Sequence, residues 1–166
     1  MFYEEIFRGL NRAKIKYIIA GGIAVNLHGI PRATGDLDLL IALDERNIIK
    51  FSKAMTRLGY RPKAPVNIED FSVKKNREKW ANEKGMKVFS LWNKKMPYKI
   101  VDVFVENPIG FRKLYSDRVD ISVGRFTIPV VSIRHLIELK KKAGRKQDIS
   151  DIELLKRVRS LAGKRI

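Results

Sequence analysis

The sequence predicts an α+β fold, in which a mixed β-sheet is flanked by helices and followed by a C-terminal pair of helices. Apolar residues recur at helical spacing near both ends of the chain, short β-rich runs lie between them, and 45% of the 166 residues are apolar, which is enough to form a real core. The order helix, strand, helix, strand, helix, several strands and two helices is that of an α+β domain. We expect a single domain over residues 1–166, with residues 132–166 as a helical tail packed on it.

The first half of the chain shows these elements in order. Residues 3–14 place Ile6, Leu10 and Ala13 on one face of a helix. A β-rich run at 15–20 follows and is interrupted by a pair of glycines. The remaining elements of this half are a helix at 23–28, a strand at 37–43, a helix at 45–58 and a loop at 61–70.

The second half alternates strands and turns before it ends in helices. Ser132 is a suitable N-cap for the first C-terminal helix, and Gly144 separates the two. Gly124 and Arg125 fit a two-residue hairpin turn. The expected elements are a helix at 74–84, which is charged on all sides, strands at 86–92, 98–105, 119–123 and 126–131, and helices at 132–143 and 148–161.

The composition narrows the chemistry that the chain can support. Without cysteine it can form neither disulfides nor thiolate metal sites, and His28 and His135 are its only imidazoles. A metal should therefore be a hard cation bound by carboxylate oxygens. No stretch approaches the roughly 20 apolar residues of a membrane span, and the first residues lack the pattern of a secretion signal. We expect a soluble cytoplasmic protein with no membrane partner.

The charge is strongly basic. Lysine and arginine outnumber aspartate and glutamate 35 to 18, which gives a net charge of +17. Residues 134–166 alone hold 11 basic and four acidic residues. Such a field attracts polyanions, which favours RNA or DNA as partner or substrate. A solvated lysine-rich surface beside a site for nucleotide phosphates explains the charge equally well, because net charge does not report clustering.

Three aspartates on or directly beside expected strands are the candidate catalytic and metal-binding residues. Asp36 and Asp38 are two apart, so in a strand they share a face at about 6.6 Å between their Cα atoms. Two carboxylates at the mouth of a buried strand repel, and a cation between them best explains the pair. Asp102 interrupts the apolar run at 100–105. If the two strands are neighbours, the three carboxylates form a cluster for two Mg²⁺ ions, or Mn²⁺ in their place, about 3.5–4 Å apart.

Structural explanations of the same residues remain open. Asp36 or Asp38 alone could cap a turn, and Asp102 alone could lie exposed at a sheet edge. Gly21 and Gly22 lie between a strand and a helix, where glycine allows a phosphate to approach the backbone but also serves many turns on steric grounds alone. The dinucleotide-binding glycine pattern and the P-loop are both missing, as is the EF-hand pattern.

The combination of these motifs resembles the nucleotidyltransferase superfamily typified by DNA polymerase beta. The family signature, Gly-Gly or Gly-Ser followed after about a dozen residues by Asp-x-Asp, matches residues 20–22 and 36–39, with thirteen residues between them. Arg32 and Thr34 complete the Arg-x-Thr-x-Asp-x-Asp form of small bacterial and archaeal members, which include relatives of abortive-infection toxins. The lysine, Gly-Arg and Asp-x-x-Asp of residues 139–152 resemble the helical motif of the same members.

The resemblance implies a role for each matched residue. Gly21 and Gly22 would hold a triphosphate through their backbone amides. Asp36 and Asp38 would bind both metal ions, and Asp102 would bind the ion that activates the attacking hydroxyl.

The basic residues of the motifs would support this site. Lys140 and Arg145 would meet phosphate or nucleobase, unless they lie on a solvated helix face. Asp148 would cap the last helix and orient Arg145, as would Asp151, with substrate contact as the alternative. Arg32 and Thr34 would steady the loop that carries Asp36, or Arg32 would itself bind phosphate.

The implied activity is metal-dependent transfer of an NMP from an NTP to an acceptor hydroxyl, with pyrophosphate as the leaving group. Candidate acceptors are the 3′ end of a tRNA or another RNA, a protein side chain, and a small molecule such as an aminoglycoside. Two readings of other classes remain open: a non-catalytic basic nucleic-acid-binding module, and a toxin–antitoxin interaction protein with a cognate antitoxin. A phosphodiesterase using the same metals is a third alternative.

Overall fold

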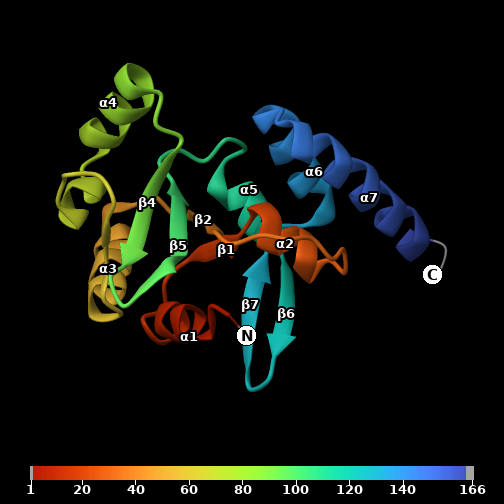
Figure 1. Cartoon of the computed structure of the whole chain (residues 1–166), viewed down its shortest axis with the longest axis horizontal. Coiled ribbons are helices and arrows are strands. Elements are labelled where there is room, and N and C mark those ends of the chain that lie inside the picture. The colour runs from red at the N-terminus through yellow and green to blue at the C-terminus, as the bar shows by residue number, and fades with distance from the viewer. Residues whose placement is uncertain (1, 164–166) are drawn as a thin grey trace.

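The computed structural model describes residues 2–163, so the first residue of the expected domain and the last three of its tail lie outside the described part. A seven-stranded mixed sheet forms its centre, with helices packed around it (Figure 1). The elements in chain order are α1 (Glu4–Arg12), β1 (Tyr17–Ile19), α2 (Gly21–Leu27), β2 (Leu37–Ile41), α3 (Glu45–Arg57), β3 (Tyr60–Pro62), the 3-10 helix η1 (Ile68–Ser72), α4 (Lys74–Lys84), β4 (Val88–Asn93), β5 (Met96–Phe104), α5 (Phe111–Ser116), β6 (Val119–Val123), β7 (Phe126–Val130), α6 (Ile133–Ala143) and α7 (Lys146–Gly163).

The sheet has the strand order β3-β4-β5-β2-β1-β7-β6, which makes β2 the central strand. It is parallel to β5 and antiparallel to β1, and β1 is in turn parallel to β7. Every residue of β2 except Asp38 is fully buried. The central strand therefore carries a single carboxylate in an otherwise apolar run, and the expected α+β fold with its mixed sheet and C-terminal helical pair is confirmed.

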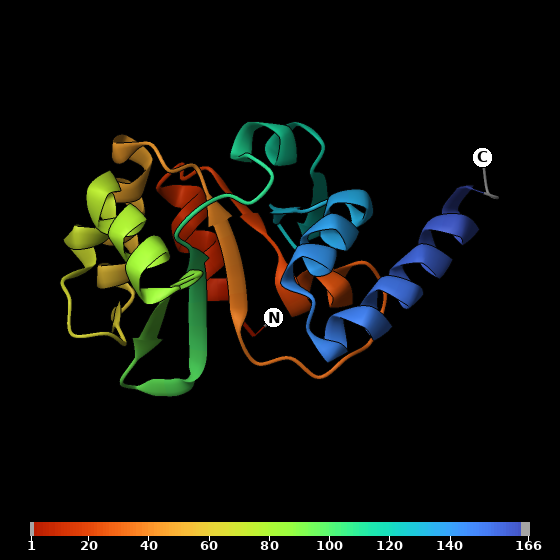
Figure 2. The same cartoon turned by 90° about the horizontal axis from the view of Figure 1, so that it is seen from above.

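The helices border the sheet on two sides of its central strands. Viewed from above, α4 lies to one side of β2 and β5, and α6 and α7 lie to the other (Figure 2). The loop that precedes β2 passes beside the first turn of α7 in the same view. Ser132 caps α6 by accepting a hydrogen bond from the backbone N–H of His135, as expected. None of the helices in residues 2–163 has both the length and the apolar character that a bilayer span requires.

Four local features differ from the sequence-based expectation. The helix expected at 23–28 begins at Gly21, so both glycines lie in its first turn. Part of the expected loop at 61–70 is the edge strand β3, which is three residues long, and η1 follows it. The short helix α5 was not expected. An edge strand that ends in a proline and a six-residue helix are both too short to show a periodic pattern.

Candidate active site

The three candidate aspartates meet on one side of the sheet. Asp38 and Asp102 are direct partners across β2 and β5, so their Cα atoms lie about 4.8 Å apart and their side chains share a face. The expectation that these two strands are neighbours is confirmed. A polar hollow of about 190 Å³ gathers seven of the nine candidate residues, namely Gly22, Arg32, Thr34, Asp36, Asp38, Asp102 and Arg145. The other two, Gly21 and Lys140, line a larger cavity beside it.

The carboxylates of this hollow repel one another. Burial raises the pKa of Asp38 to about 6, and the charges of Asp102 and Asp36 add to the effect, while Arg145 and the Gly22 amide oppose it. Burial likewise raises the pKa of Asp102, against a hydrogen bond from Ser90 that lowers it. Keeping these carboxylates ionised in the folded protein therefore costs free energy, and a bound cation would reduce that cost.

The donor set fits a hard cation such as Mg²⁺. Within residues 2–163, no three acidic, histidine or cysteine side chains are already arranged as a complete metal site. Mg²⁺ rarely uses such a cage, because it keeps several waters and is completed by one or two carboxylates and substrate phosphates. Asp36, Asp38 and Asp102 would hold the ion in the hollow, where a cation would offset the repulsion among their negative charges.

The paired glycines allow the carboxylate to approach α2. Gly21 has φ +62°, and a Cβ there would lie 1.8 Å from Oδ2 of Asp38. A Cβ on Gly22 would lie 2.4 Å from Oγ1 of Thr34. The Gly22 amide donates a hydrogen bond to Asp38, which lowers the pKa of that carboxyl. The contact seen is thus with the carboxylate and its loop, and the triphosphate contact of these amides stays a prediction.

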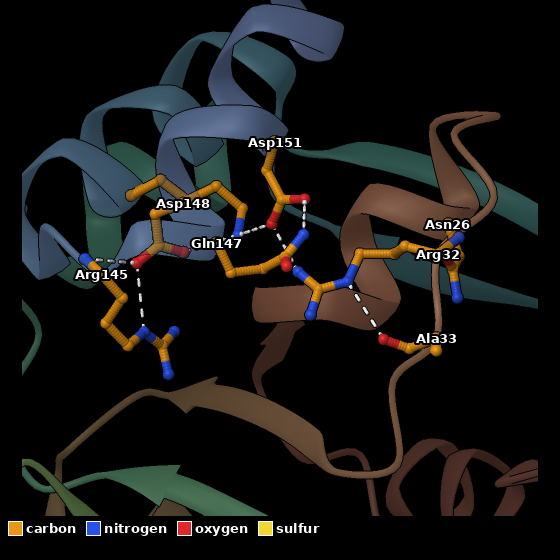
Figure 3. A network of polar contacts seen from close by, with 8 residues as sticks. Asn26, Arg32, Ala33, Arg145, Gln147, Asp148 and Asp151 are labelled. Atoms are coloured by element: carbon orange, nitrogen blue, oxygen red, sulfur yellow. Dashed lines mark hydrogen bonds and ion pairs between the residues drawn. The ribbon is translucent and has the colours of Figure 1, made fainter.

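The C-terminal basic residues differ from one another in their surroundings (Figure 3). Lys140 is buried, with Nζ 3.0 Å from Oδ1 of Asp148 and 2.6 Å from Oδ2 of Asp151. It therefore does not lie on a solvated helix face, which was one of the two expectations. The side chain of Arg145 is 74% exposed, and its Nε donates to Oδ2 of Asp148 at 3.1 Å. Its terminal nitrogens have no hydrogen-bond partner in the described part of the chain, so of these two residues Arg145 is the cation available to a ligand.

The loop before β2 is tied to both neighbouring helices. Nη1 of Arg32 forms an ion pair with Oδ2 of Asp151 on α7, and the Arg32 backbone N–H donates to Oδ1 of Asn26 on α2 at 3.0 Å. Asp148 accepts hydrogen bonds from both the backbone and the side chain of Arg145, which orients that arginine. Asp151 instead holds Arg32, so the two aspartates share Lys140 but have different arginine partners.

Sequence reasoning missed two supporting residues and one cavity. Oγ of Ser90 on β4 donates to Oδ1 of Asp102 at 2.6 Å. The hydroxyl of Tyr3 donates to the carbonyl of Gly35, directly before Asp36, and lies 3.1 Å from the Ile100 carbonyl oxygen. The cavity, about 610 Å³, has many apolar walls. The first contact depends on the register of β4 and β5, and the second on how the residues before α1 pack against the loop before β2, and neither has a local sequence signal.

Ser90→Ala should raise the pKa of Asp102, because the hydroxyl that stabilises its ionised form is lost. As the pH is lowered, the Asp102 carboxyl would then become protonated at a higher pH than in the wild type. NMR titration of the carboxyl carbon of Asp102 in the two proteins would measure the shift. Ser116→Ala removes an exposed hydroxyl that donates to the Lys113 carbonyl, and should leave the profile unchanged. Coincident profiles for wild type and Ser90→Ala would contradict the prediction.

Comparison with known proteins identifies the fold. No protein-family model and no curated protein matches the sequence. Among solved structures, the lincosamide antibiotic adenylyltransferase LnuA, bound to lincomycin, is similar with a TM-score of 0.60 and 18% identity over 93% of this chain and 96% of its own. ANT(2″)-Ia, in complex with adenylyl-2″-tobramycin, is similar with a TM-score of 0.59 and 13% identity over 98% of this chain and 94% of its own. TM1012 of Thermotoga maritima, a protein proposed to be a nucleotidyltransferase, is similar with a TM-score of 0.58 and 16% identity over 98% of this chain and 91% of its own. The chain has the fold of these nucleotidyltransferases.

Proposed function

We propose that this chain is a metal-dependent nucleotidyltransferase that moves an NMP from an NTP to an acceptor hydroxyl. One observation carries the proposal: Asp38 and Asp102 are paired across adjacent strands, beside Asp36 and the exposed guanidinium of Arg145, in a fold shared with nucleotidyltransferases. Phosphoryl transfer requires positioning and charge neutralisation more than covalent help from the protein. A carboxylate cluster with an available arginine supplies both.

Each residue has a part in this scheme. Asp36 and Asp38 hold the site for Mg²⁺, which when bound neutralises phosphate charge and makes the acceptor hydroxyl easier to ionise. Arg145 contacts the phosphates, since its fork of terminal nitrogens matches phosphate oxygens. Asp102, which accepts a hydrogen bond from Ser90, would be the third carboxylate that holds the ion. The acceptor hydroxyl gives up its proton to water and its oxygen forms a bond to the α-phosphorus. The bond from that phosphorus to the oxygen that joins it to the β-phosphorus breaks, and pyrophosphate leaves.

The larger cavity is the proposed place of the nucleoside. Its volume of about 610 Å³ is in the usual range of ligand sites. Phe104 of β5 and Leu136 and Leu139 of α6 contribute apolar walls, while Lys87 and Lys142 contribute cations. Both hollows are lined by Asp38 and Arg145, so a nucleotide can lie across them with its phosphates at the carboxylates.

Two observations favour different classes of acceptor. The net charge of +17 favours an RNA, with tRNA first, over an uncharged acceptor. LnuA is a lincosamide antibiotic adenylyltransferase, and ANT(2″)-Ia was solved with adenylyl-2″-tobramycin. Small molecules that carry hydroxyl groups are therefore also acceptors worth testing. A labelled NTP incubated with tRNA, a protein mixture, lincomycin and tobramycin in separate reactions would identify the labelled product. A protein acceptor or a cognate antitoxin stays a prediction of the sequence.

Calorimetric titration of the four NTPs, with and without Mg²⁺, tests the nucleotide site. We expect wild type to bind at least one NTP only with Mg²⁺. The Asp36→Asn, Asp38→Asn double variant should bind it about a hundredfold more weakly or not at all, because two of the three carboxylates that would hold the metal are gone. Glu69→Gln combined with Asp120→Asn removes the same charge from exposed positions and should bind as wild type does. NTP binding that is independent of Mg²⁺ and of both aspartates would refute the proposal. Equal RNA binding with and without Mg²⁺, and none to NTP, would favour the non-catalytic nucleic-acid-binding module instead.

A further inference from the structure

Five charged side chains form a connected cluster in the wall of the polar hollow, and three of them are almost without exposure. The side chains of Lys140, Asp148 and Asp151 are 5%, 2% and 1% exposed. Lys140 belongs to α6, the two aspartates to α7, and the arginines to the residues that lead into β2 and α7. Lys140 and both aspartates are buried ionisable groups, and none of them has a part in the transfer scheme above.

The cluster has two arms that meet at the lysine. Asp148 turns Oδ1 to the Lys140 ammonium at 3.0 Å and Oδ2 to Nε of Arg145 at 3.1 Å. Oδ2 of Asp151 faces the ammonium at 2.6 Å and also forms the ion pair with Arg32. Each aspartate is thus shared between Lys140 and one arginine, and both arginines line the polar hollow. Figure 3 shows Arg32 beside Asp151 and Arg145 beside Asp148.

The balance of charge in the cluster explains why Lys140 affects the positions of Arg32 and Arg145. A buried carboxylate needs a cationic partner, and the loss of one leaves a costly uncompensated charge. With Lys140 present, Asp148 can be satisfied while only Nε of Arg145 is engaged. Without it, each aspartate would have to draw its arginine further into the cluster, which would remove the guanidinium from the hollow.

We infer that Lys140 is a positioning residue that acts through Asp148 on Arg145 and through Asp151 on Arg32. Although Lys140 borders the larger cavity, its ammonium is already held by two carboxylates, and a phosphate would have to displace one of them from a buried site. Lys140 therefore orients the cations of the nucleotide site without binding the nucleotide. This inference rests on the proposed function only for what the two arginines bind.

A spectroscopic test needs no nucleotide. The side-chain Nε–H resonances of Arg32 and Arg145, assigned by the loss of each signal in an Arg→Ala variant, report the surroundings of each guanidinium. Lys140→Met should shift both signals, whereas Lys141→Met, which removes the same charge from the exposed neighbour on α6, should shift neither. Asp148→Asn should shift mainly Arg145, and Asp151→Asn mainly Arg32.

A thermodynamic cycle separates positioning from direct contact. Lys140→Met should weaken binding of the magnesium NTP complex about tenfold in wild type, but less than twofold when Arg32 and Arg145 are both already alanine, because residues that act through one another are not additive. Equal losses in both backgrounds, or unchanged arginine signals in Lys140→Met, would overturn the inference. Should Lys140→Met fail to fold, the two Asp→Asn variants decide: selective shifts support it, and equal or absent shifts refute it. A wild type that binds no NTP would defeat the proposed function, while the resonances would still decide whether Lys140 positions the arginines.

Discussion

Asp38→Asn should make the metal-free protein more stable at pH 7.5 while it abolishes nucleotide transfer. The ordinary pKa of this carboxyl is 3.8, and burial with the charges of Asp102 and Asp36 raises it to about 6. Keeping the group ionised in the folded protein at neutral pH therefore costs about 3 kcal/mol, since each pKa unit corresponds to about 1.4 kcal/mol. Asparagine carries no charge and keeps an oxygen for the Gly22 amide. We expect a gain of up to about 3 kcal/mol in the free energy of unfolding.

The pH dependence of this gain has a definite sign. Because the folded pKa is raised, the wild type suffers no penalty below pH 3.8, an increasing one between 3.8 and about 6, and the full penalty above that. The difference between variant and wild type should therefore be largest at pH 7.5 and about half as large at pH 5. Urea unfolding at the two pH values measures it, with exposed Asp120→Asn as the control. A variant less stable than wild type at pH 7.5, or a difference independent of pH, would contradict the assignment.

This cost is what a metal-nucleotide site would be expected to show in the free protein. Mg²⁺ with an NTP should stabilise the wild type and leave Asp38→Asn unchanged, because only a ligand that binds the folded state raises its stability. The stability difference should then narrow as the ligand concentration rises. Repulsion among Asp36, Asp38 and Asp102 thus connects the energetics of the fold to the proposed chemistry.

The sequence predicted the parts of this site that follow a short-range pattern. The spacing of Asp36 and Asp38 predicted that both lie on one face of a strand, and the apolar run around Asp102 predicted a second strand. Both strands form, but β2 begins at Leu37, so Asp36 directly precedes it; Asp36 and Asp38 nevertheless line the same polar hollow. It was the adjacency of these strands, fixed by the sheet order, that only the structure could establish. Residues that support the site from a distance in sequence, such as Ser90 and Tyr3, carry no local signal, because a serine or tyrosine in a strand or helix has many ordinary uses.

The role of Lys140 likewise could not be predicted from the sequence, although its position was. Its motif marked it as important, but a lysine on a helix can point to solvent, to substrate or into a buried ion pair, and the sequence does not distinguish these. The choice depends on whether α7 packs against α6 so that Asp148 and Asp151 meet the ammonium. Tertiary packing, and not helical spacing alone, decides which of the basic residues remains available to a phosphate.

Gly21→Ala should reduce nucleotide transfer about a hundredfold, because its Cβ would lie 1.8 Å from Oδ2 of Asp38 and must push that carboxylate away. The backbone contributes as well, since φ is +62° and alanine in this region costs about 1–2 kcal/mol. Gly124→Ala isolates that second effect: its φ is +58°, nothing lies within 4 Å of the added Cβ, and the residue sits in the β6–β7 hairpin outside the hollow.

Both glycine variants should therefore lose similar stability through the backbone, but only Gly21→Ala should lose NTP affinity and transfer rate. Urea unfolding measures the first quantity, and calorimetry with a labelled-nucleotide assay measures the second. A Gly21→Ala protein that binds magnesium NTP within twofold of wild type would mean that Asp38 can move without consequence for the nucleotide. Asp38 would then lose its place as a metal ligand, and the glycine pair would be needed only for the turn into α2.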